Sequence, residues 1–508
     1  MKKIVGFILA VCMAAAVSGC SENSGGEKLS VMMFSSVDIT SVPLTQRLEA
    51  RTDKEIEWQV VDNTEQISLL FASGDYTDVV ISNVLQDTDI SRYAASGVIV
   101  PLDEYINEDI TPNLCKLFER VPSAKAVSTM TDGHIYSLPR YNGVEADYVE
   151  NYLFINKSWL DKLGLDIPET TDDLYNVLKA FKDKDPNGNG VADEIPMSFK
   201  DGHAFAYPEA LLSCWGAATK HGNFEGFTTI KNGEVMFAPM MDEWKEMIKY
   251  YKRLYSEGLL DIEAFTQTNE QYNAKLASNL SIVGMAWSKT NPFANADEYI
   301  VIKPVNAPGK EVVWRVHPGS LGIKNVFAVT NKCKDIEAAM RWVDEFYTEE
   351  ATLESWYGAV GDTFTVKDGV YTFNEPEDGK SLKQWVVENT VSGVNLPGVF
   401  YEDEIGRLVE DSEMWTSAQE SYDLYKDYLD KETWPRPYYS AEDATRISEL
   451  RTDIFNIVSQ TKAQWIAGNK DVDSEWDKYL DDLKAVGVDE YIEINQRAYD
   501  TYKKAMEK

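Results

Sequence analysis

Short apolar segments alternate with amphipathic segments along the first part of the chain. Residues 29–34, 56–60 and 79–81 have the apolar or alternating pattern of strands. Between them, residues 42–51 and 67–72 repeat apolar positions at helical spacing. Strands separated by helices in this way predict a largely parallel sheet with helices on its faces.

The rest of the chain predicts a second α/β run and a helical C-terminal part. Further strands are expected at residues 153–156, 281–287, 299–303 and 323–330, and a helix is expected to start at Ser158. The C-terminal part is helical in period, with Asp, Glu and Lys between Trp, Tyr and Leu. The chain has 508 residues. Because single cores rarely grow beyond roughly 250–300 residues, we expect two lobes.

The N-terminus has the features of a signal peptide over residues 1–19. Two lysines precede an apolar run, residues 4–17, which is shorter than the ~20 residues that a spanning helix needs. VSGC at residues 17–20 resembles a bacterial lipobox, in which the cysteine sulfur carries a diacylglycerol after cleavage. We therefore expect a lipid on Cys20 and a polar tether over residues 20–28. The alternative is a plain secretory signal with an incidental cysteine.

Three cysteines, Cys115, Cys214 and Cys333, remain in the expected mature chain. Their odd number and wide spacing exclude a disulfide framework and allow one bridge at most. None of them has the short spacing that is typical of metal ligands. We interpret all three as buried small hydrophobic residues.

The acidic excess narrows the list of partners. The chain has 49 Lys and Arg against 84 Asp and Glu, a formal charge of −35, which becomes −37 without the two leader lysines. Nucleic-acid binding needs a cationic surface that releases counterions, and binding to an anionic membrane needs a basic patch. The charge therefore argues against both as main partners. The 44% hydrophobic content is enough to fill the cores of two lobes.

Several motifs give the chain a family resemblance. ASGD at 72–75, YSLP at 136–139 and LFINK at 153–157 resemble elements of the extracellular solute-binding proteins of bacterial ABC importers. Residues 333–342 and the tail 439–477 are similar to helices of their large lipoprotein subfamily, which includes alginate- and oligosaccharide-binding proteins. In the first of these helices isoleucine replaces the usual proline. The resemblance implies an α/β, periplasmic-binding-protein-like fold with two lobes, a hinge, a cleft between the lobes and a helix-rich C-terminal part.

The resemblance also implies how the chain divides. The first lobe would take residues 29–143 and 296–360, and the second lobe 144–295 and 361–508, with approximate boundaries. Such interleaved segments cross between the lobes, and closure on a ligand would be a hinge motion. The implied protein is a monomer, lipid-anchored at the extracellular face of a bacterial membrane. It would deliver an oligosaccharide to the transmembrane permease subunits of an ABC importer.

A loop rich in Asp and Asn offers the oxygen ligands that Ca²⁺ requires. A hard cation takes about six to eight oxygens, which alternate residues of a tight loop can supply. One register fits the EF-hand spacing and uses Asp183, Asp185, Asn187, Gly188 and Glu194. The subfamily's calcium loop uses a second register, whose ligands here are Asp185, Asn187, Asn189, Asp193, Glu194 and the carbonyl of Val191. We expect a structural Ca²⁺ in the second register; the alternative is a solvated Asn-Gly turn.

Aromatic and polar residues at loop positions are the candidates for ligand binding. Sugars present apolar C–H faces ringed by hydroxyls, so their sites pair flat aromatic rings with amides and carboxylates. Aromatic residues make up 12% of the chain, so position has to select among them. The candidates follow strands or lie at the expected crossings: Asp38, Arg140, Tyr141, Trp287, Trp314, His317 and Trp356. For each of them a helix cap, a hinge contact or core packing is the competing interpretation.

The sequence does not predict an enzyme. It has no H-E-x-x-H, G-x-S-x-G or Walker A motif, and its four histidines are scattered. Glycoside hydrolases use a pair of facing carboxylates, but none of the acidic residues stands in a recognisable catalytic context. The closer alternatives are an importer component for a peptide or another small solute, and a surface adhesin that binds glycans without serving a transporter.

Overall fold

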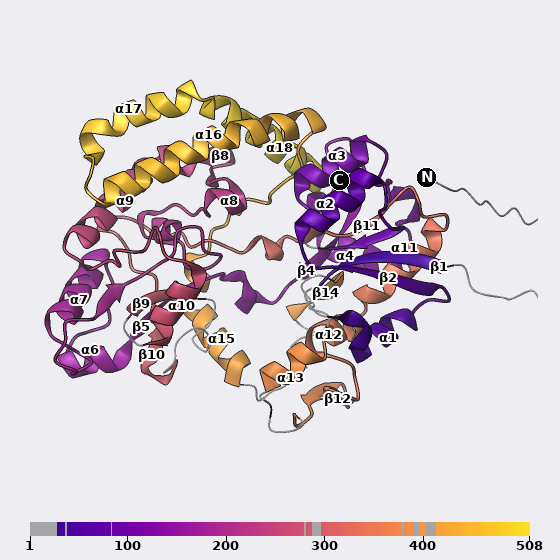
Figure 1. Ribbon diagram of the computed structural model, residues 1–508, viewed down its shortest axis with the longest axis horizontal. Helices are drawn as coiled ribbons and strands as arrows, with labels where there is room; N and C mark the ends of the chain where they lie inside the picture. The colour runs from indigo at the N-terminus through magenta and orange to yellow at the C-terminus, as the bar shows by residue number, and fades with distance from the viewer. Residues whose placement is uncertain are drawn as a thin grey trace, which may run out of the picture.

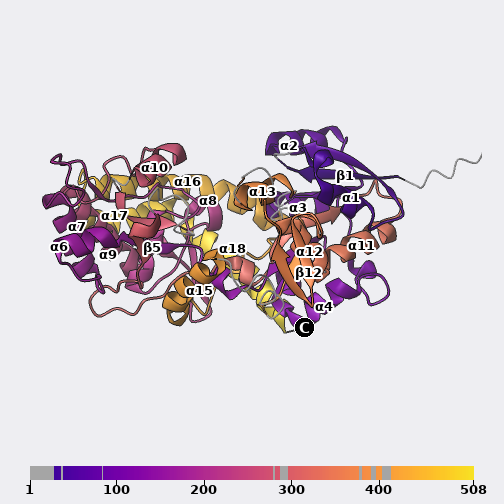
Figure 2. The same cartoon turned by 90° about the horizontal axis from the view of Figure 1, so that it is seen from below.

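The chain forms two α/β lobes that lie side by side, with helices α16 to α18 running along one side of both (Figure 1). The same two lobes are separate in the view from below, with β1 and α11 in one and β5 and α7 in the other (Figure 2). The computed structural model describes residues 28–507 except for 36–37, 83, 279–280, 287–295, 377–379, 381, 391–395 and 403–412.

The strands are three to seven residues long. They are β1 (Lys28–Phe34), β2 (Glu55–Val61), β3 (Val79–Ile81), β4 (Ser137–Asn142), β5 (Tyr152–Asn156), β6 (Ile195–Met197), β7 (Thr228–Lys231), β8 (Glu234–Phe237), β9 (Ser281–Ala286), β10 (Tyr299–Val301), β11 (Ile323–Val329), β12 (Phe364–Lys367), β13 (Val370–Phe373) and β14 (Gly398–Phe400).

The two longest α-helices lie in the C-terminal part of the chain. They are α1 (Pro43–Glu49), α2 (Thr64–Ser73), α3 (Asp87–Ala95), α4 (Pro112–Arg120), α5 (Pro122–Ser128), α6 (Lys157–Leu163), α7 (Thr171–Asp183), α8 (Gly222–Glu225), α9 (Asp242–Ser256), α10 (Asn269–Ala277), α11 (Ile336–Asp344), α12 (Glu349–Tyr357), α13 (Leu382–Glu388), α15 (Glu413–Tyr425), α16 (Ala441–Ile466), α17 (Val472–Ala485) and α18 (Val488–Met506).

The first lobe is built on a six-stranded sheet in the order β14-β4-β11-β3-β1-β2. β1 is parallel to β2 and β3, β4 is parallel to β14, and β11 runs antiparallel between β3 and β4. Val31 and Met33 pack on one face with residues of α1, α4 and α11, whereas Met32 packs on the other with α2 and α3. Because both faces are buried, β1 is apolar at nearly every position.

The second lobe contains a four-stranded sheet in the order β10-β5-β9-β6. β5 is antiparallel to β9 and β10, and β6 is parallel to β9. Its core joins Trp159 of α6, Phe181 of α7 and Trp244 of α9 with Trp465 of α16 and Trp476 of α17. The C-terminal helices are therefore part of the second lobe's core rather than an appended bundle.

The predicted fold class is confirmed in its two α/β lobes and its helix-rich C-terminal part, and most predicted strands match those of the structure within a few residues. β10 pairs with β5 in the second lobe and lies only a few residues past the approximate boundary predicted at residue 296. β14 pairs with β4 in the first lobe, although the predicted division gives its residues to the second lobe. The lobe boundaries stay a prediction.

Three segments that cross between the lobes lie together. The first crossing (residues 143–151) joins β4 to β5, the second (302–322) joins β10 to β11, and the third (426–440) joins α15 to α16. The first and second pair through an antiparallel bridge, and the second and third pair through a parallel bridge at Trp314. The N–H of Trp314 donates to the carbonyl of Tyr428 at 2.6 Å. The three crossings therefore form a hydrogen-bonded ribbon.

Four buried charges hold this ribbon against the second lobe. The guanidinium of Arg315, on the second crossing, contacts Glu150 on the first crossing and Glu225 of α8, and Lys220 also contacts Glu150. None of these side chains is more than 9% exposed. Burial alone would raise the pKa of Glu150, but Arg315 and Lys220 hold it at about 2. Glu150 is therefore ionised at neutral pH, and the four charges are paired.

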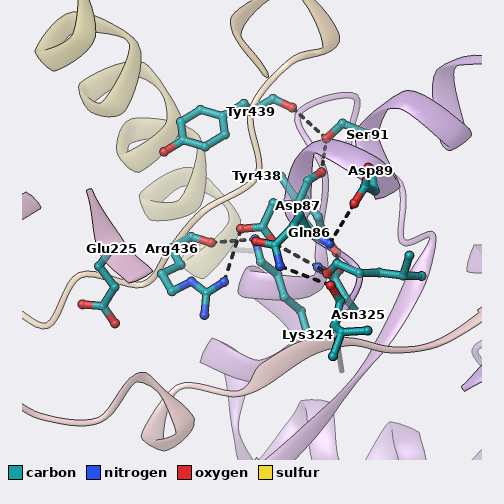
Figure 3. A network of polar contacts seen from close by, with 12 residues as sticks. Gln86, Asp87, Asp89, Ser91, Glu225, Lys324, Asn325, Arg436, Tyr438 and Tyr439 are labelled. Carbon is teal, nitrogen blue, oxygen red and sulfur yellow. Dashed lines mark hydrogen bonds and ion pairs between the residues drawn. The ribbon is translucent and has the colours of Figure 1, made fainter. Parts of the chain in front are cut away.

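The third crossing is anchored in the first lobe by a polar network (Figure 3). Nζ of Lys324 in β11 donates to the carbonyl of Arg436 at 2.6 Å and lies 3.2 Å from Oδ1 of Asp87 in α3. The hydroxyl of Tyr438 contacts Oδ1 of Asn325 and lies 2.8 Å from the hydroxyl of Ser137. Burial lowers the pKa of Lys324 to about 8.

Helix α16 extends this link back to the second lobe. It begins beside α3 of the first lobe and then packs on α9 of the second. Nζ of Lys462, near its end, donates to Oδ1 of Asp201 at 2.7 Å and to Oε1 of Glu209 at 2.6 Å. Lys462 is 1% exposed. One helix thus has contacts with both lobes, and a buried lysine fixes its C-terminal half.

Replacing Arg315 by methionine is expected to destabilise the protein strongly. The change keeps an apolar stem but leaves the carboxylate of Glu225 buried without its guanidinium and Glu150 with Lys220 alone. Breaking a buried ion network in this way lowers the free energy of unfolding by about 3–5 kcal/mol. Urea denaturation of the protein without its leader measures the change.

The matched control is Arg446→Met. Arg446 pairs with Glu490 at 2.6 Å, but both side chains are nearly half exposed, and exposed pairs contribute little to stability. Equal losses in the two variants would contradict the role given to Arg315.

Candidate functional site

The carboxyl ends of five strands in the first lobe lie at the edge of the sheet that faces the crossings. β1, β2, β3, β4 and β14 all end there, and the antiparallel β11 begins there, since Ile323 pairs with Arg140 near the end of β4. Open α/β sheets bind ligands outside the carboxyl ends of their strands. Three predicted ligand-binding residues, Asp38, Arg140 and Tyr141, lie at this edge.

The second lobe turns the corresponding edge toward the same crossings. β5 begins where the first crossing ends, and Tyr152 at its start pairs with Ala286 at the end of β9. Because β6 is parallel to β9, it ends at this edge as well. The loop after β6 therefore emerges toward the crossings. Trp287, the predicted stacking residue after β9, lies outside the described residues.

Asp38 caps a short 3-10 helix after β1. Its Oδ1 accepts hydrogen bonds from the backbone N–H of Thr40 at 3.0 Å and from the Thr40 hydroxyl at 2.6 Å. These hydrogen bonds lower the pKa of Asp38, so its carboxylate is ionised at neutral pH. Asp38 is exposed. The cap role is therefore present, and a ligand contact for Asp38 stays a prediction.

Arg140 and Trp356 lie against each other at the end of β4. The guanidinium carbon of Arg140 is 5.0 Å from the ring centroid of Trp356, which is 5.6 Å from that of Phe400. Burial lowers the pKa of Arg140 to about 10, so it keeps its charge at neutral pH. Nε1 of Trp356 is buried and has no hydrogen-bond partner among the described residues. Tyr141, the next residue on β4, is 9% exposed.

In this structure Trp314 and His317 pack and form hydrogen bonds that hold the second crossing. Trp314 is fully buried, its Nε1 donates to the carbonyl of Asn151 at 3.1 Å, and its ring lies 5.0 Å from that of Tyr425. Nδ1 of His317 accepts from the N–H of Gly319 at 2.9 Å. Burial lowers the pKa of His317 to about 4, so the ring is neutral. The packing interpretation accounts for both residues, and their contact with a ligand stays a prediction.

The loop after α7 concentrates oxygen atoms as a hard cation requires. The carboxylate of Asp185 accepts the N–H groups of Gly188 and Gly190 at 2.8 and 2.9 Å. The amide of Asn189 lies 3.0 Å from a carboxylate oxygen of Asp193. The predicted carbonyl ligand Val191 is exposed.

Glu194 provides the clearest sign that the loop fits a cation. Its Oε1 is buried and has no hydrogen-bond partner among the described residues. Burial and the charges of Asp185 and Asp193 raise the pKa of Glu194. A Ca²⁺ ion would compensate this concentration of negative charge, and Asn187, Asn189 and the three carboxylates are the ligand types that it prefers.

A second acidic cluster already contains a cation. In the described part of the chain, Asp201, Glu209 and His221 are the one set of three Asp, Glu, His or Cys residues whose ligand atoms lie within 4.8 Å of one another; the loop carboxylates are farther apart. The ammonium group of Lys462 donates to both carboxylates of this cluster. It therefore takes the position that a metal ion would need.

The residues that hold the crossings were missed by the sequence interpretation. Glu150, Lys220 and Glu225 make the buried contacts with Arg315, yet no spacing links them, because Arg315 is 165 residues from Glu150. Glu150 is one of 84 Asp and Glu residues, and nothing in the sequence around it indicates that it is buried in an ion network. A candidate could have been found only by asking which charges lie beside a predicted crossing.

Comparisons with known proteins agree with this geometry. The family model described as bacterial extracellular solute-binding protein matches residues 36–353. The fructooligosaccharide ABC transporter substrate-binding protein FusA of Streptococcus pneumoniae serotype 4 is 31% identical over 479 residues, which cover 90% of this chain and 87% of that protein.

Solved structures extend the likeness to three dimensions. An HMO-binding, ABC-transporter-associated solute-binding protein from Bifidobacterium longum infantis is 28% identical, with a TM-score of 0.82 over 94% of this chain and 99% of that chain. S. pneumoniae FusA in complex with kestose is 30% identical, with a TM-score of 0.80 over the same shares. A FusA EF-hand mutant in complex with fructo-nystose is 29% identical, with a TM-score of 0.79 over the same shares.

Two lobes whose sheet edges face a common set of crossings define a hinged, two-lobe binding protein. The chain belongs to the bacterial extracellular solute-binding proteins, and its predicted periplasmic-binding-protein-like fold is confirmed. Within the described residues, no helix combines the length and the apolar content needed to cross a bilayer.

Proposed function

We propose that the protein captures an extracellular oligosaccharide between its lobes and delivers it to the permease of an ABC importer. The observation that carries the proposal is geometric: the strand ends of both sheets turn toward the same crossings, where open α/β sheets bind their ligands. The named ligands of the relatives, fructooligosaccharides and HMO, support the ligand class. Binding, with no catalytic step, would be the whole activity.

The first lobe would supply much of the recognition. Trp356 offers a partly exposed aromatic ring at the end of β4. Arg140, against that ring, would donate to sugar hydroxyls, and Asp38, which follows β1 at the same edge of the sheet, would accept from them. Tyr141 completes this set. We keep Trp287 as a second-lobe contact, whereas Trp314 and His317 would act from the second crossing.

A glycan screen is expected to find a sugar that raises the melting temperature of the protein without its leader. A ligand at 100 times its Kd stabilises the folded state by about 2.7 kcal/mol. Kestose and fructo-nystose are the first probes, and a peptide library is the matched comparison. Stabilisation by peptides and by no glycan would contradict the proposal, and release of shorter sugars during incubation would contradict the absence of catalysis.

Growth on the bound sugar distinguishes a component of an importer from a surface adhesin. The bound sugar should support growth of the parent strain but not of a strain that lacks this protein. Growth without the protein, at the same rate, would favour the adhesin alternative.

We propose that the loop after α7 binds a structural Ca²⁺. Asp185, Asn187, Asn189, Asp193 and Glu194 would provide side-chain oxygens. The buried, unpartnered Oε1 of Glu194 supports this site, and FusA has a loop that its solved mutant names an EF-hand. Bound Ca²⁺ would neutralise the carboxylates and fix the connection between α7 and β6.

Chelation is expected to lower the melting temperature. Saturating Ca²⁺ at 100 times its Kd would contribute about 2.7 kcal/mol, which EDTA removes. Asp193→Ala should be less stable than the parent protein and insensitive to EDTA. Asp161→Ala, an exposed surface change on α6, should respond to EDTA as the parent protein does. An unchanged melting temperature of the parent protein on chelation would contradict the site.

We propose that Cys20 carries the lipid anchor that holds the protein at the outer face of the membrane. Two acyl chains give stable anchoring where one chain gives only marginal binding. Cys20→Ala is therefore expected to move the protein from the membrane fraction into the medium. Cys115→Ala is the matched control and should leave it in the membrane fraction. A Cys20→Ala protein that stays membrane-bound would contradict the anchor.

A further inference from the structure

One exposed aromatic residue in the second lobe has no role in the site described so far. Phe205 lies in the loop after β6, which emerges at the edge of the second sheet that faces the crossings. Its side chain is 38% exposed, whereas the next two residues, Ala206 and Tyr207, are fully buried. The chain therefore enters the core immediately after presenting this ring.

The backbone of Phe205 is fixed on both sides. Nδ2 of Asn151, the last residue of the first crossing, donates to the carbonyl of Phe205 at 2.8 Å. Nδ1 of His203 accepts the N–H groups of Phe205 and Ala206 at 3.1 and 3.0 Å. The N–H of Lys200 donates to the carbonyl of Ala206 at 3.0 Å and closes the loop. An exposed phenyl ring is thus held in place by buried or partly buried partners.

These contacts tie the ring to the crossing itself. Asn151 is 2% exposed, so its hydrogen bond to Phe205 is shielded from water. Burial lowers the pKa of His203, which keeps the imidazole neutral and its Nδ1 able to accept at neutral pH. Both anchors persist without a ligand, so binding does not have to order the loop.

We propose that Phe205 is a stacking residue for a sugar ring, supplied by the second lobe. A flat aromatic face matches the apolar C–H face of a pyranose or furanose, and an aromatic side chain has only two torsions to immobilise. A single exposed phenyl ring presents far less apolar surface than a protein–protein interface buries, so Phe205 alone does not indicate a docking site for another protein. Phe205 then adds an aromatic face from the second lobe to that of Trp356 from the first. This inference rests on the proposed function.

The experiment compares three variants with the parent protein by calorimetric titration. The probe is kestose or, if kestose does not bind, the panel glycan that gives the largest rise in melting temperature. Phe205→Ala is expected to weaken binding about tenfold or more, whereas Phe205→Tyr, which keeps the ring, should bind within about threefold of the parent protein.

Ile167→Ala is the matched control. Ile167 is similarly exposed, at 44%, but lies between α6 and α7, at the end of the second lobe farthest from the first (Figure 1). It should bind as the parent protein does. If the parent protein binds a glycan and Phe205→Ala binds it equally well, the stacking role is wrong and the proposed function stands. If the parent protein binds no glycan, both the proposed function and the stacking role of Phe205 are wrong.

Discussion

The guanidinium of Arg315 lies between two buried carboxylates, and the arrangement of the lobes depends on this contact. Glu150 belongs to the first crossing and Glu225 to the second lobe, so one side chain joins both to the second crossing. Buried charges are stable only when their partners are in place. The network therefore selects one register for the ribbon of crossings, and that register determines where the two sheet edges face each other.

Two further buried cations are used in the same way. Lys324 anchors the third crossing to the first lobe, and Lys462 anchors α16 to the second. In both cases a lysine from one element satisfies oxygen atoms of elements distant in the sequence. Together the two lysines fix the third crossing and α16 to both lobes.

The pattern of apolar and polar residues predicted those elements that depend on residues close together in the sequence. The apolar positions of β1, β2 and β3 are continuous or alternate, and this pattern predicted the three strands. Asp38 was selected because it follows a strand, and Arg140 because it lies at the first crossing. β14 is three residues long and begins with Gly398, which weakens a strand pattern, and the sheet that β10 joins depends on a partner far away in the sequence. The burial of Trp314 depends on Tyr425 and Asn151, which no motif connects to it. No sequence pattern distinguishes Phe205 as a site residue. An aromatic residue two positions before the buried Tyr207 has the appearance of a core residue in the sequence.

The interleaving of the lobes also affects how the chain is made. The first lobe's sheet lacks its β14 edge until residue 400 has been synthesised, and Tyr438 still has to reach that lobe's core. The second lobe's core needs Trp465 and Trp476. Neither lobe can complete its native packing while most of the chain is still being translated. A nascent chain of this kind remains unfolded for longer, and that is the state in which a polypeptide can be threaded through a secretion channel before it folds outside the cell.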